Sequence, residues 1–249
     1  MAHLSGFGLI TAPDLYSSSA TPGENLMVGQ LAWDGKTGKA YRYALAGASA
    51  LVKGNLLQEA AEDTTYENMA IGTAGAVGDN YLQVTNGTAT ITAAQFKGGS
   101  IGVYTAGTVA IGDEYTIVDV TGTLTTGGAL KVWLDRPLRY AYTTSATVNM
   151  KRSPWSGVIQ MPATTPTGMP VGVAQYEIPA AKYGWVQTHG MATVLSDGST
   201  FAVGSGVGTP SGTAGSFTVG AVATTKHVVG VARQAAASAK GIAVFLQID

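Results

Sequence analysis

Ser100 is the residue whose neighbours most resemble those of an activated nucleophile. It lies in Gly98-Gly99-Ser100-Ile101-Gly102, which has the G-x-S-x-G spacing of the turn that presents the serine of many hydrolases. That turn follows a strand and opens a helix, whereas here residues 103–107 continue a strand pattern. We therefore interpret the motif as a glycine-rich hairpin turn and assign Ser100 no catalytic role.

The three histidines are the next candidates for chemistry. His3, His189 and His227 are far apart, and none has the close spacing to another histidine or to a carboxylate that is typical of metal sites. We expect His189 to lie in a strand and to share a face with Trp185 and Gln187. A packed or exposed side chain without a chemical role is the simpler interpretation.

Two acidic pairs, Glu62/Asp63 and Asp113/Glu114, could supply oxygen ligands to a cation. Neither pair follows the spacing of a calcium-binding loop. The second pair comes directly after Gly112 and has the composition of a turn that leads into a strand. We therefore predict solvated turn carboxylates at both places and no metal site.

Two further motifs have weaker chemical meaning. The segment 204–209 (GSGVGT) lacks the lysine of a phosphate-binding loop and the third glycine of a dinucleotide fingerprint, so we predict a flexible β connection without a cofactor. Asn86-Gly87-Thr88 matches a glycosylation sequon, which we interpret as a turn. Together, the motifs predict no catalytic, metal-binding or cofactor-binding residue, and hence a protein that is not an enzyme.

Aromatic side chains could form a binding surface in place of a catalytic site. The chain has 11 tyrosines and four tryptophans, Trp33, Trp133, Trp155 and Trp185. Exposed aromatic rings can stack on sugars, although such residues more often anchor a core or an interface. The sequence leaves both interpretations open.

The composition indicates a protein that assembles with others. Charged residues make up 12% of the 249-residue chain, about half of the roughly 25% usual for soluble proteins. With so few charged side chains, part of the surface is expected to be covered by partner chains. The net charge of −1 and the absence of a basic stripe disfavour nucleic acid as a partner.

Several other sequence features exclude particular classes. There is no cysteine, so neither disulfides nor thiolate chemistry can occur. The first residues lack the pattern of a secretory signal, and no segment has the apolar density to span a bilayer. We therefore expect a soluble protein without a secretory route or a membrane partner.

The secondary structure that positions these residues is predicted to consist almost entirely of β-strands. Short strands alternate with Gly, Asn-Gly and Pro turns, as in residues 31–33 and 40–43 around a hairpin turn. Leu130, Val132 and Leu134 alternate with polar neighbours, as do the apolar residues of 242–248, so each strand buries one face. Residues 54–70 fit either a short helix or a strand followed by a loop.

These elements predict a mainly β fold with two sandwich- or barrel-like lobes. Residues 1–25 are rich in Gly, Ser and Pro and are predicted to form an extended N-terminal arm. Prolines punctuate the chain from 137 to 170, which places the boundary between the lobes near residue 147. The predicted lobes are therefore 26–146 and 147–249.

Several segments resemble the capsid-associated structural proteins of tailed bacteriophages. The resemblance covers most of residues 50–249. It implies a virion component of the decoration (cement) protein family, which binds the outside of the capsid lattice as a symmetric oligomer, with no catalytic residue. The segments that carry it are 52–58 (VKGNLLQ), 96–99 (FKGG), 112–117 (GDEYTI), 134–138 (LDRPL), 182–190 (KYGWVQTHG), 229–232 (VGVA) and the strand 244–248.

From this resemblance we expect the lobes to bridge neighbouring capsomers while the 1–25 arm extends along an adjacent chain. The expected partners are the major capsid protein and further copies of this chain, with a trimer favoured, on virions assembled in the host cytoplasm. A host-binding module of a phage fibre or head spike is the alternative, and a depolymerase is a third and weaker hypothesis because it needs paired carboxylates or an activated serine in a cleft.

Overall fold

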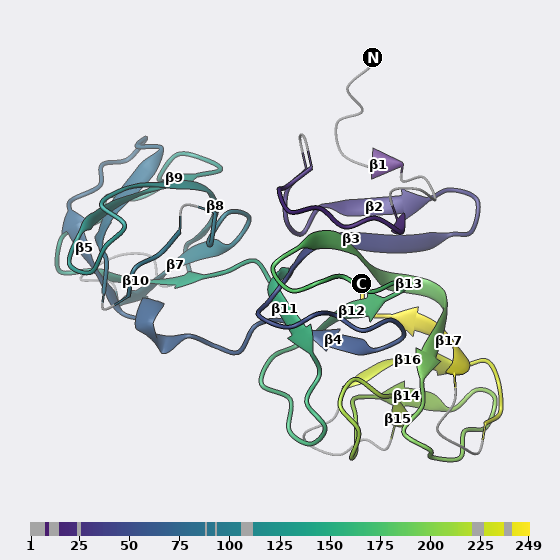
Figure 1. Cartoon of the computed structure of the whole chain (residues 1–249). Helices are drawn as coiled ribbons and strands as arrows, with labels where there is room; N and C mark the ends of the chain where they lie inside the picture. The colour runs from purple at the N-terminus through teal and green to yellow at the C-terminus, as the bar shows by residue number, and fades with distance from the viewer. Residues whose placement is uncertain are drawn as a thin grey trace. The chain divides into compact units, whose positions relative to one another are not determined.

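The chain folds as two β units (Figure 1), which confirms the predicted mainly β class. The computed structural model describes residues 8–9, 15–23, 26–87, 89–92, 94–105, 112–220, 227–236 and 241–249. Unit 1 consists of Met1–Ala61 and Pro154–Asp249, and unit 2 of Glu62–Ser153. Unit 2 is therefore inserted into unit 1, whereas the sequence predicted two consecutive lobes that meet near residue 147.

Both ends of unit 2 lie close together, which explains how it can be inserted. The Lys151 ammonium lies 2.5 Å from a carboxylate oxygen of Glu62, and Arg152 pairs with Asp63 at 3.6 Å. When the two ends of a unit lie side by side, the unit can be inserted into the chain of another unit without distorting it. The proline-rich segment indicated one of the two points where the chain passes between the units, whereas the point after Ala61 has no comparable sequence pattern.

Unit 1 is built on one sheet of 11 strands. Because β3 pairs with β13 as well as with β2 and β11, the sheet closes into a ring through β3, β11, β4, β12 and β13. The strands are β1 (Gly8–Leu9), β2 (Leu31–Asp34), β3 (Lys39–Ala46), β4 (Leu56–Gln58), β11 (Ser156–Gln160), β12 (Pro170–Ala174), β13 (Tyr183–Leu195), β14 (Gly206–Gly208), β15 (Thr218–Val219), β16 (Val228–Ala232) and β17 (Gly241–Gln247).

The long strand β13 links the ring to the rest of the sheet. Its first half pairs with β3 and β12, and its second half pairs with β17 from His189 to Leu195. The pairing with β3 shifts register between Gln187 and His189. The buried Gln187 amide donates hydrogen bonds of 2.9 and 3.0 Å to the carbonyls of His189 and Met191, which stabilises this irregularity.

Separate apolar clusters fill unit 1. One cluster includes Ala44, Leu57 and Val186 from strands of the ring. A larger cluster forms where Ile242, Val244 and Leu246 of β17 meet the neighbouring strands and loops, and all three side chains are fully buried. The alternation predicted for this strand is therefore confirmed.

The described part of the predicted arm lies on unit 1 of its own chain. Ser19 and Tyr183 exchange backbone hydrogen bonds of 3.0 and 2.8 Å, and the Gly23 N–H donates to the Tyr43 hydroxyl at 3.0 Å. Leu15 is buried in a cluster with Tyr43 and Tyr183. Residues 15–23 thus cover a face of β3 and β13, while most of the rest of 1–25 falls outside the described residues.

Unit 2 is a closed barrel of six strands. Its apolar core includes Leu130, Val132 and Leu134, whose exposed neighbours alternate with them as predicted. A single 3₁₀ turn, η1 (Thr64–Tyr66), precedes the first strand. The barrel order is β10 (Thr147–Lys151), β5 (Met69–Thr73), β6 (Tyr81–Thr85), β9 (Ala129–Leu134), β8 (Glu114–Gly122) and β7 (Ser100–Thr105).

Residues 54–70 and the proline-punctuated segment both contain β-strands. Residues 54–70 form β4, a loop, η1 and the start of β5, so the strand interpretation holds and the helix interpretation is wrong. The proline-punctuated segment contains three strands, β10, β11 and β12. Pro170 is the first residue of β12, a position where a missing N–H is tolerated.

Candidate functional site

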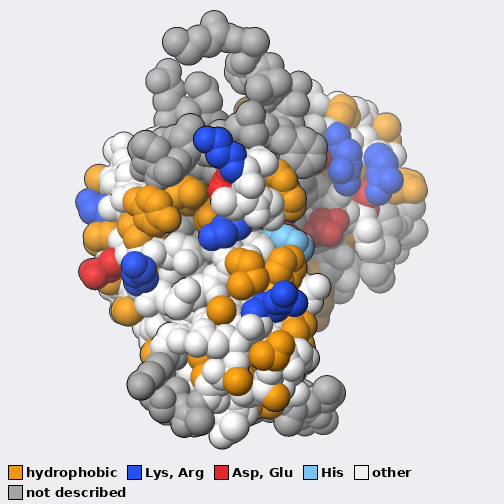
Figure 2. Space-filling view, turned by 90° about the vertical axis from the view of Figure 1, so that its right-hand side faces the viewer, with side chains coloured by type: hydrophobic (Ala, Val, Ile, Leu, Met, Phe, Trp, Pro, Cys, Tyr) orange, Lys and Arg blue, Asp and Glu red, His pale blue; other side chains and the backbone are white. Residues whose placement is uncertain are grey.

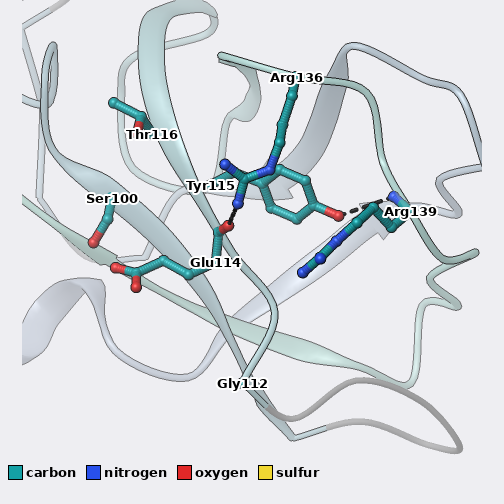
Figure 3. Close-up of a pocket in the computed structure, with 7 residues that line it drawn as sticks. All are labelled: Ser100, Gly112, Glu114, Tyr115, Thr116, Arg136 and Arg139. Atoms are coloured by element: carbon teal, nitrogen blue, oxygen red, sulfur yellow. Dashed lines mark hydrogen bonds between the residues drawn. The ribbon is translucent and has the colours of Figure 1, made fainter.

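A depression of about 390 Å³ on unit 2 collects charged and hydroxyl side chains (Figure 3). The strands β7 and β8 supply part of its lining, and the loop that follows β9 supplies two arginines. The lining residues are Ser100, Gly112, Glu114, Tyr115, Thr116, Arg136 and Arg139.

The buried carboxylate of Asp113 holds one side of this depression in place. The hydroxyls of Tyr115 and Tyr142 each donate to its Oδ2 at 2.5 Å, and Arg139 Nε donates to its Oδ1 at 3.0 Å. Arg139 Nη2 donates to the same Oδ1. The Asp113 side chain is 1% exposed and the Arg139 side chain 59%, so a buried anion fixes an exposed cation.

These contacts shift the pKa values of Asp113 and Tyr142. Burial alone would raise the pKa of Asp113, but hydrogen bonds from Tyr115, Tyr142 and Arg139 outweigh it and hold the pKa below its ordinary value. Burial and the acceptor role of Asp113 raise the pKa of Tyr142. The Asp113 carboxylate therefore stays ionised and Arg139 stays charged at neutral pH.

Arg136 is fixed by different contacts. Its guanidinium carbon lies 5.1 Å from the centroid of the Tyr115 ring, and its Nη1 donates to Asp135 at 3.2 Å. Its Nη2 donates to the carbonyl of Glu114 on β8. The other carboxylate oxygen of Asp135 accepts from the Thr116 N–H at 2.9 Å, which ties the loop to the strand. Both arginines are thus positioned before any partner arrives.

The chemistry of this site favours binding. Two oriented guanidinium groups beside hydroxyl groups can hold acidic or polar groups of a partner. Ser100 lies on β7 opposite Thr116, and no hydrogen bond joins it to Glu114 within the described residues, although Figure 3 shows that carboxylate turned toward Ser100. Residues 62–153 contain no histidine that could serve as a base.

The structure decides several of the sequence interpretations. The turn at 94–98 leads into strand β7, so Ser100, Ile101 and Gly102 lie in a strand, as the pattern after them predicted. The turn before them is not the predicted hairpin turn, because β7 pairs with β8 and β10 and not with the preceding strand β6. Asp113 is not the solvated turn carboxylate that we predicted, because it is buried beneath Arg139. Glu62 and Asp63 are exposed as expected, with Asp63 accepting from the Thr65 N–H at the start of η1.

The remaining predicted residues are spread over the chain. His3 and Thr88 lie outside the described residues, and His227 is exposed beside β16. The segment 204–209 contains β14, which pairs with β15 and β16, so it is not merely a flexible connection. Asn86 is buried, and its amide donates to three carbonyls, those of residues 89, 124 and 125.

His189 belongs to a row of apolar side chains on unit 1. Its ring stacks on Trp33 at a centroid distance of 6.0 Å and meets the edge of Phe245 at 5.1 Å. Met191 is paired directly with Phe245 across β13 and β17. We call Trp33, His189, Phe245 and Met191 the apolar row.

Sequence reasoning missed Arg136, Arg139 and Tyr142. Arg139 and Tyr142 lie 26 and 29 residues after Asp113, and no local periodicity joins them to it. Within the described residues, no group of three or more His, Asp or Glu side chains gathers closely enough to hold a metal ion. The same residues include no helix that is both long and apolar enough to cross a bilayer.

Comparisons with protein-family models, with curated proteins and with solved structures gave no match.

Proposed function

We propose that this chain is a structural protein of a bacteriophage virion, a decoration (cement) protein that binds the outside of the head and bridges capsomers. The observation that carries the proposal is the apolar row on unit 1, in which Trp33 and Met191 are each 40% exposed. Large apolar side chains that adjoin one another on a surface are typical of contacts between proteins.

The composition supports the same role. Charged residues account for only 12% of the chain. Only a small share of the side chains would therefore be less stable against a protein partner than in water. On the face that Figure 2 presents, hydrophobic side chains lie in several groups between isolated basic and acidic ones. Burial of such a surface against another protein is favourable, because it removes apolar area from water.

The positioned arginines of unit 2 suit a second contact. Arginine is enriched among the residues that dominate binding energy at interfaces. Because Arg136 and Arg139 already have fixed partners, they lose less side-chain freedom on binding than free arginines would. An acidic group on a neighbouring chain is the partner that fits them.

The proposed partners are the major capsid protein and further copies of this chain, with a trimer as the favoured oligomer. A symmetric lattice offers many identical sites, so contacts that are weak one by one hold strongly when they engage together. This role places the protein on the capsid surface, after synthesis in the host cytoplasm. It requires no catalysis, cofactor, nucleic acid or membrane.

The alternative is a host-binding module of a fibre or head spike, and one reconstruction tests both. Electron cryomicroscopy of the intact particle should locate density for both units on the outer shell. Density at a fibre or spike would support the alternative, and its absence from the particle would overturn both roles.

A binding measurement with purified heads tests the apolar row itself. Met191→Asp should weaken binding about tenfold or more, because it places a charge in an apolar contact. Met169→Asp is the matched control, since Met169 is also an exposed methionine of unit 1, at 44%, but lies outside the row. Equal effects of the two changes would contradict the assignment of the row.

A further inference from the structure

The outer face of three barrel strands in unit 2 carries an ordered grid of aromatic and polar side chains. Strand pairing places Tyr81 and Asp119 opposite Trp133, on either side of it. The next row on the same face has Lys131 in the middle. The grid comprises Tyr81, Trp133 and Asp119 in one row and Gln83, Lys131 and Thr121 in the other.

These side chains point away from the core because the residues between them fill it. Leu82, Val132 and Val120, which alternate with the grid along the three strands, are 1% exposed or less. Trp133, by contrast, is 37% exposed. The grid is therefore the solvent face of a sheet whose other face is fixed by the barrel core.

The Trp133 ring has a defined orientation. Its indole N–H donates to the Thr121 hydroxyl at 2.9 Å, and its centroid lies 5.2 Å from that of Tyr81, with the ring planes tilted by 50°. A ring held in this way loses little freedom when a ligand stacks on it. Lys131 covers Tyr81 with its ammonium 4.9 Å from the ring centroid, which leaves Trp133 as the ring open to a ligand.

The polar members of the grid offer both donors and acceptors. Asp119 forms an exposed ion pair with Lys97 at 3.3 Å and keeps acceptor capacity on its carboxylate. The Gln83 amide has no hydrogen-bond partner among the described residues. These groups lie around one exposed indole, on a face that is neither purely apolar nor strongly charged.

We propose that this grid is a saccharide-binding site, with the indole of Trp133 as the stacking platform. A pyranose ring has an apolar face of C–H groups and a rim of hydroxyls that both donate and accept hydrogen bonds. The C–H face would stack on Trp133, while the hydroxyls reach the amide of Gln83 and the carboxylate of Asp119.

The charges of the face favour a neutral sugar over a nucleic acid. A nucleic-acid strand could also stack a base on Trp133, but it needs a track of cations along its phosphates. Here, Lys131 is the one cation of the grid, and the neighbouring Lys97 is paired with Asp119. This site is independent of the shell contacts proposed above, since it needs no capsid and shares no residue with the apolar row or with the pair Arg136 and Arg139.

Titration of the full-length protein with neutral oligosaccharides tests the site. The probes are hexasaccharides of glucose, N-acetylglucosamine, mannose, galactose and rhamnose, followed by NMR of the four tryptophan indole N–H signals. At least one sugar should shift the signal that disappears in Trp133→Ala. That variant should raise the Kd about tenfold or more, while Tyr104→Ala, which removes an exposed aromatic ring of unit 2 outside the grid, should leave it unchanged.

Gln83→Ala provides a second variant that spares the aromatic platform and should weaken binding by a smaller factor. Absence of binding to all five probes at about 10 mM would overturn the proposal, because even weak sugar sites saturate there. So would binding that Trp133→Ala leaves intact, or binding of an oligothymidylate in preference to every sugar. Unchanged thermal unfolding of each variant establishes that a lost signal reflects binding.

Discussion

The exposed guanidinium of Arg139 is held by a carboxylate, that of Asp113, which is almost completely buried, with Nε 3.0 Å from Oδ1. Asp113 lies directly before β8, and Arg139 lies in the loop after β9, so the contact fastens that loop to the barrel. The hydroxyls of Tyr115 and Tyr142 complete the coordination of the carboxylate. An arginine positioned in this way is suited to binding an acidic or polar group of a partner.

Tyr142→Phe should lower the free energy of unfolding of unit 2 by about 1.5–3 kcal/mol, because it removes a hydrogen bond to a buried charged group. Tyr140→Phe is the matched control, since Tyr140 is 43% exposed, and should change the stability by less than about 0.5 kcal/mol. Urea denaturation of both variants measures the difference. Equal stabilities would show that the Tyr142 hydroxyl contributes nothing to the network.

Acid should destabilise unit 2 through Asp113. Its pKa is lower in the folded protein than in the unfolded chain, where an aspartate titrates at about 3.9. The stabilisation is therefore present above that value and is lost as the pH falls through the folded pKa. Thermal unfolding between about pH 2 and 7 should show a steeper acid limb for the native protein than for Asp113→Asn. Parallel curves would contradict this role for Asp113.

Gly99→Ala should destabilise unit 2, although Gly102→Ala, in the same motif, should not. A Cβ at Gly99 would clash with the carbonyl oxygen of Lys151, a backbone atom that cannot easily move, whereas a Cβ at Gly102 meets only ordinary contacts. The expected loss for Gly99→Ala is about 1–3 kcal/mol. Denaturation midpoints of the two variants test whether the close approach of the Lys151 backbone is the reason for a glycine at position 99.

Leu15→Ala should lower the stability of unit 1 by about 2 kcal/mol, because Leu15 is buried against β3 and β13. Met27→Ala is the control, since Met27 is 50% exposed, and should have little effect. This result would show that residues 15–23 are part of the fold of unit 1. A free arm would tolerate both substitutions equally, as judged by thermal unfolding.

Residues 62–153 should fold when expressed alone, since they contain all six strands of the closed barrel. A fragment of residues 26–146 should not, because it lacks β10, which closes the barrel between β5 and β7, and the strands that pair with β3 and β4. Circular dichroism and dispersed NMR spectra distinguish the two outcomes. If the 26–146 fragment folded and the 62–153 fragment did not, the division into units would be contradicted.

The sequence by itself determined the class of the fold and several of its strands. Alternation at Leu130, Val132 and Leu134 specified which face of β9 is buried, since a period of two is a local property of an extended chain. The hairpin of β2 and β3 was likewise predictable, because its turn residues lie between two apolar runs. The strand pattern after Gly99 also predicted β7.

Only the tertiary structure decided where the units divide and what surrounds the site. The return of the chain at Pro154 to the unit that it left after Ala61 depends on pairing between strands far apart in sequence, which no local pattern encodes. Asp113 was misread as a solvated turn residue for the same reason, since its partners Arg139 and Tyr142 are brought to it by closure of the barrel. The burial of a charged group depends on what the rest of the chain packs against it, and that is decided by the fold as a whole.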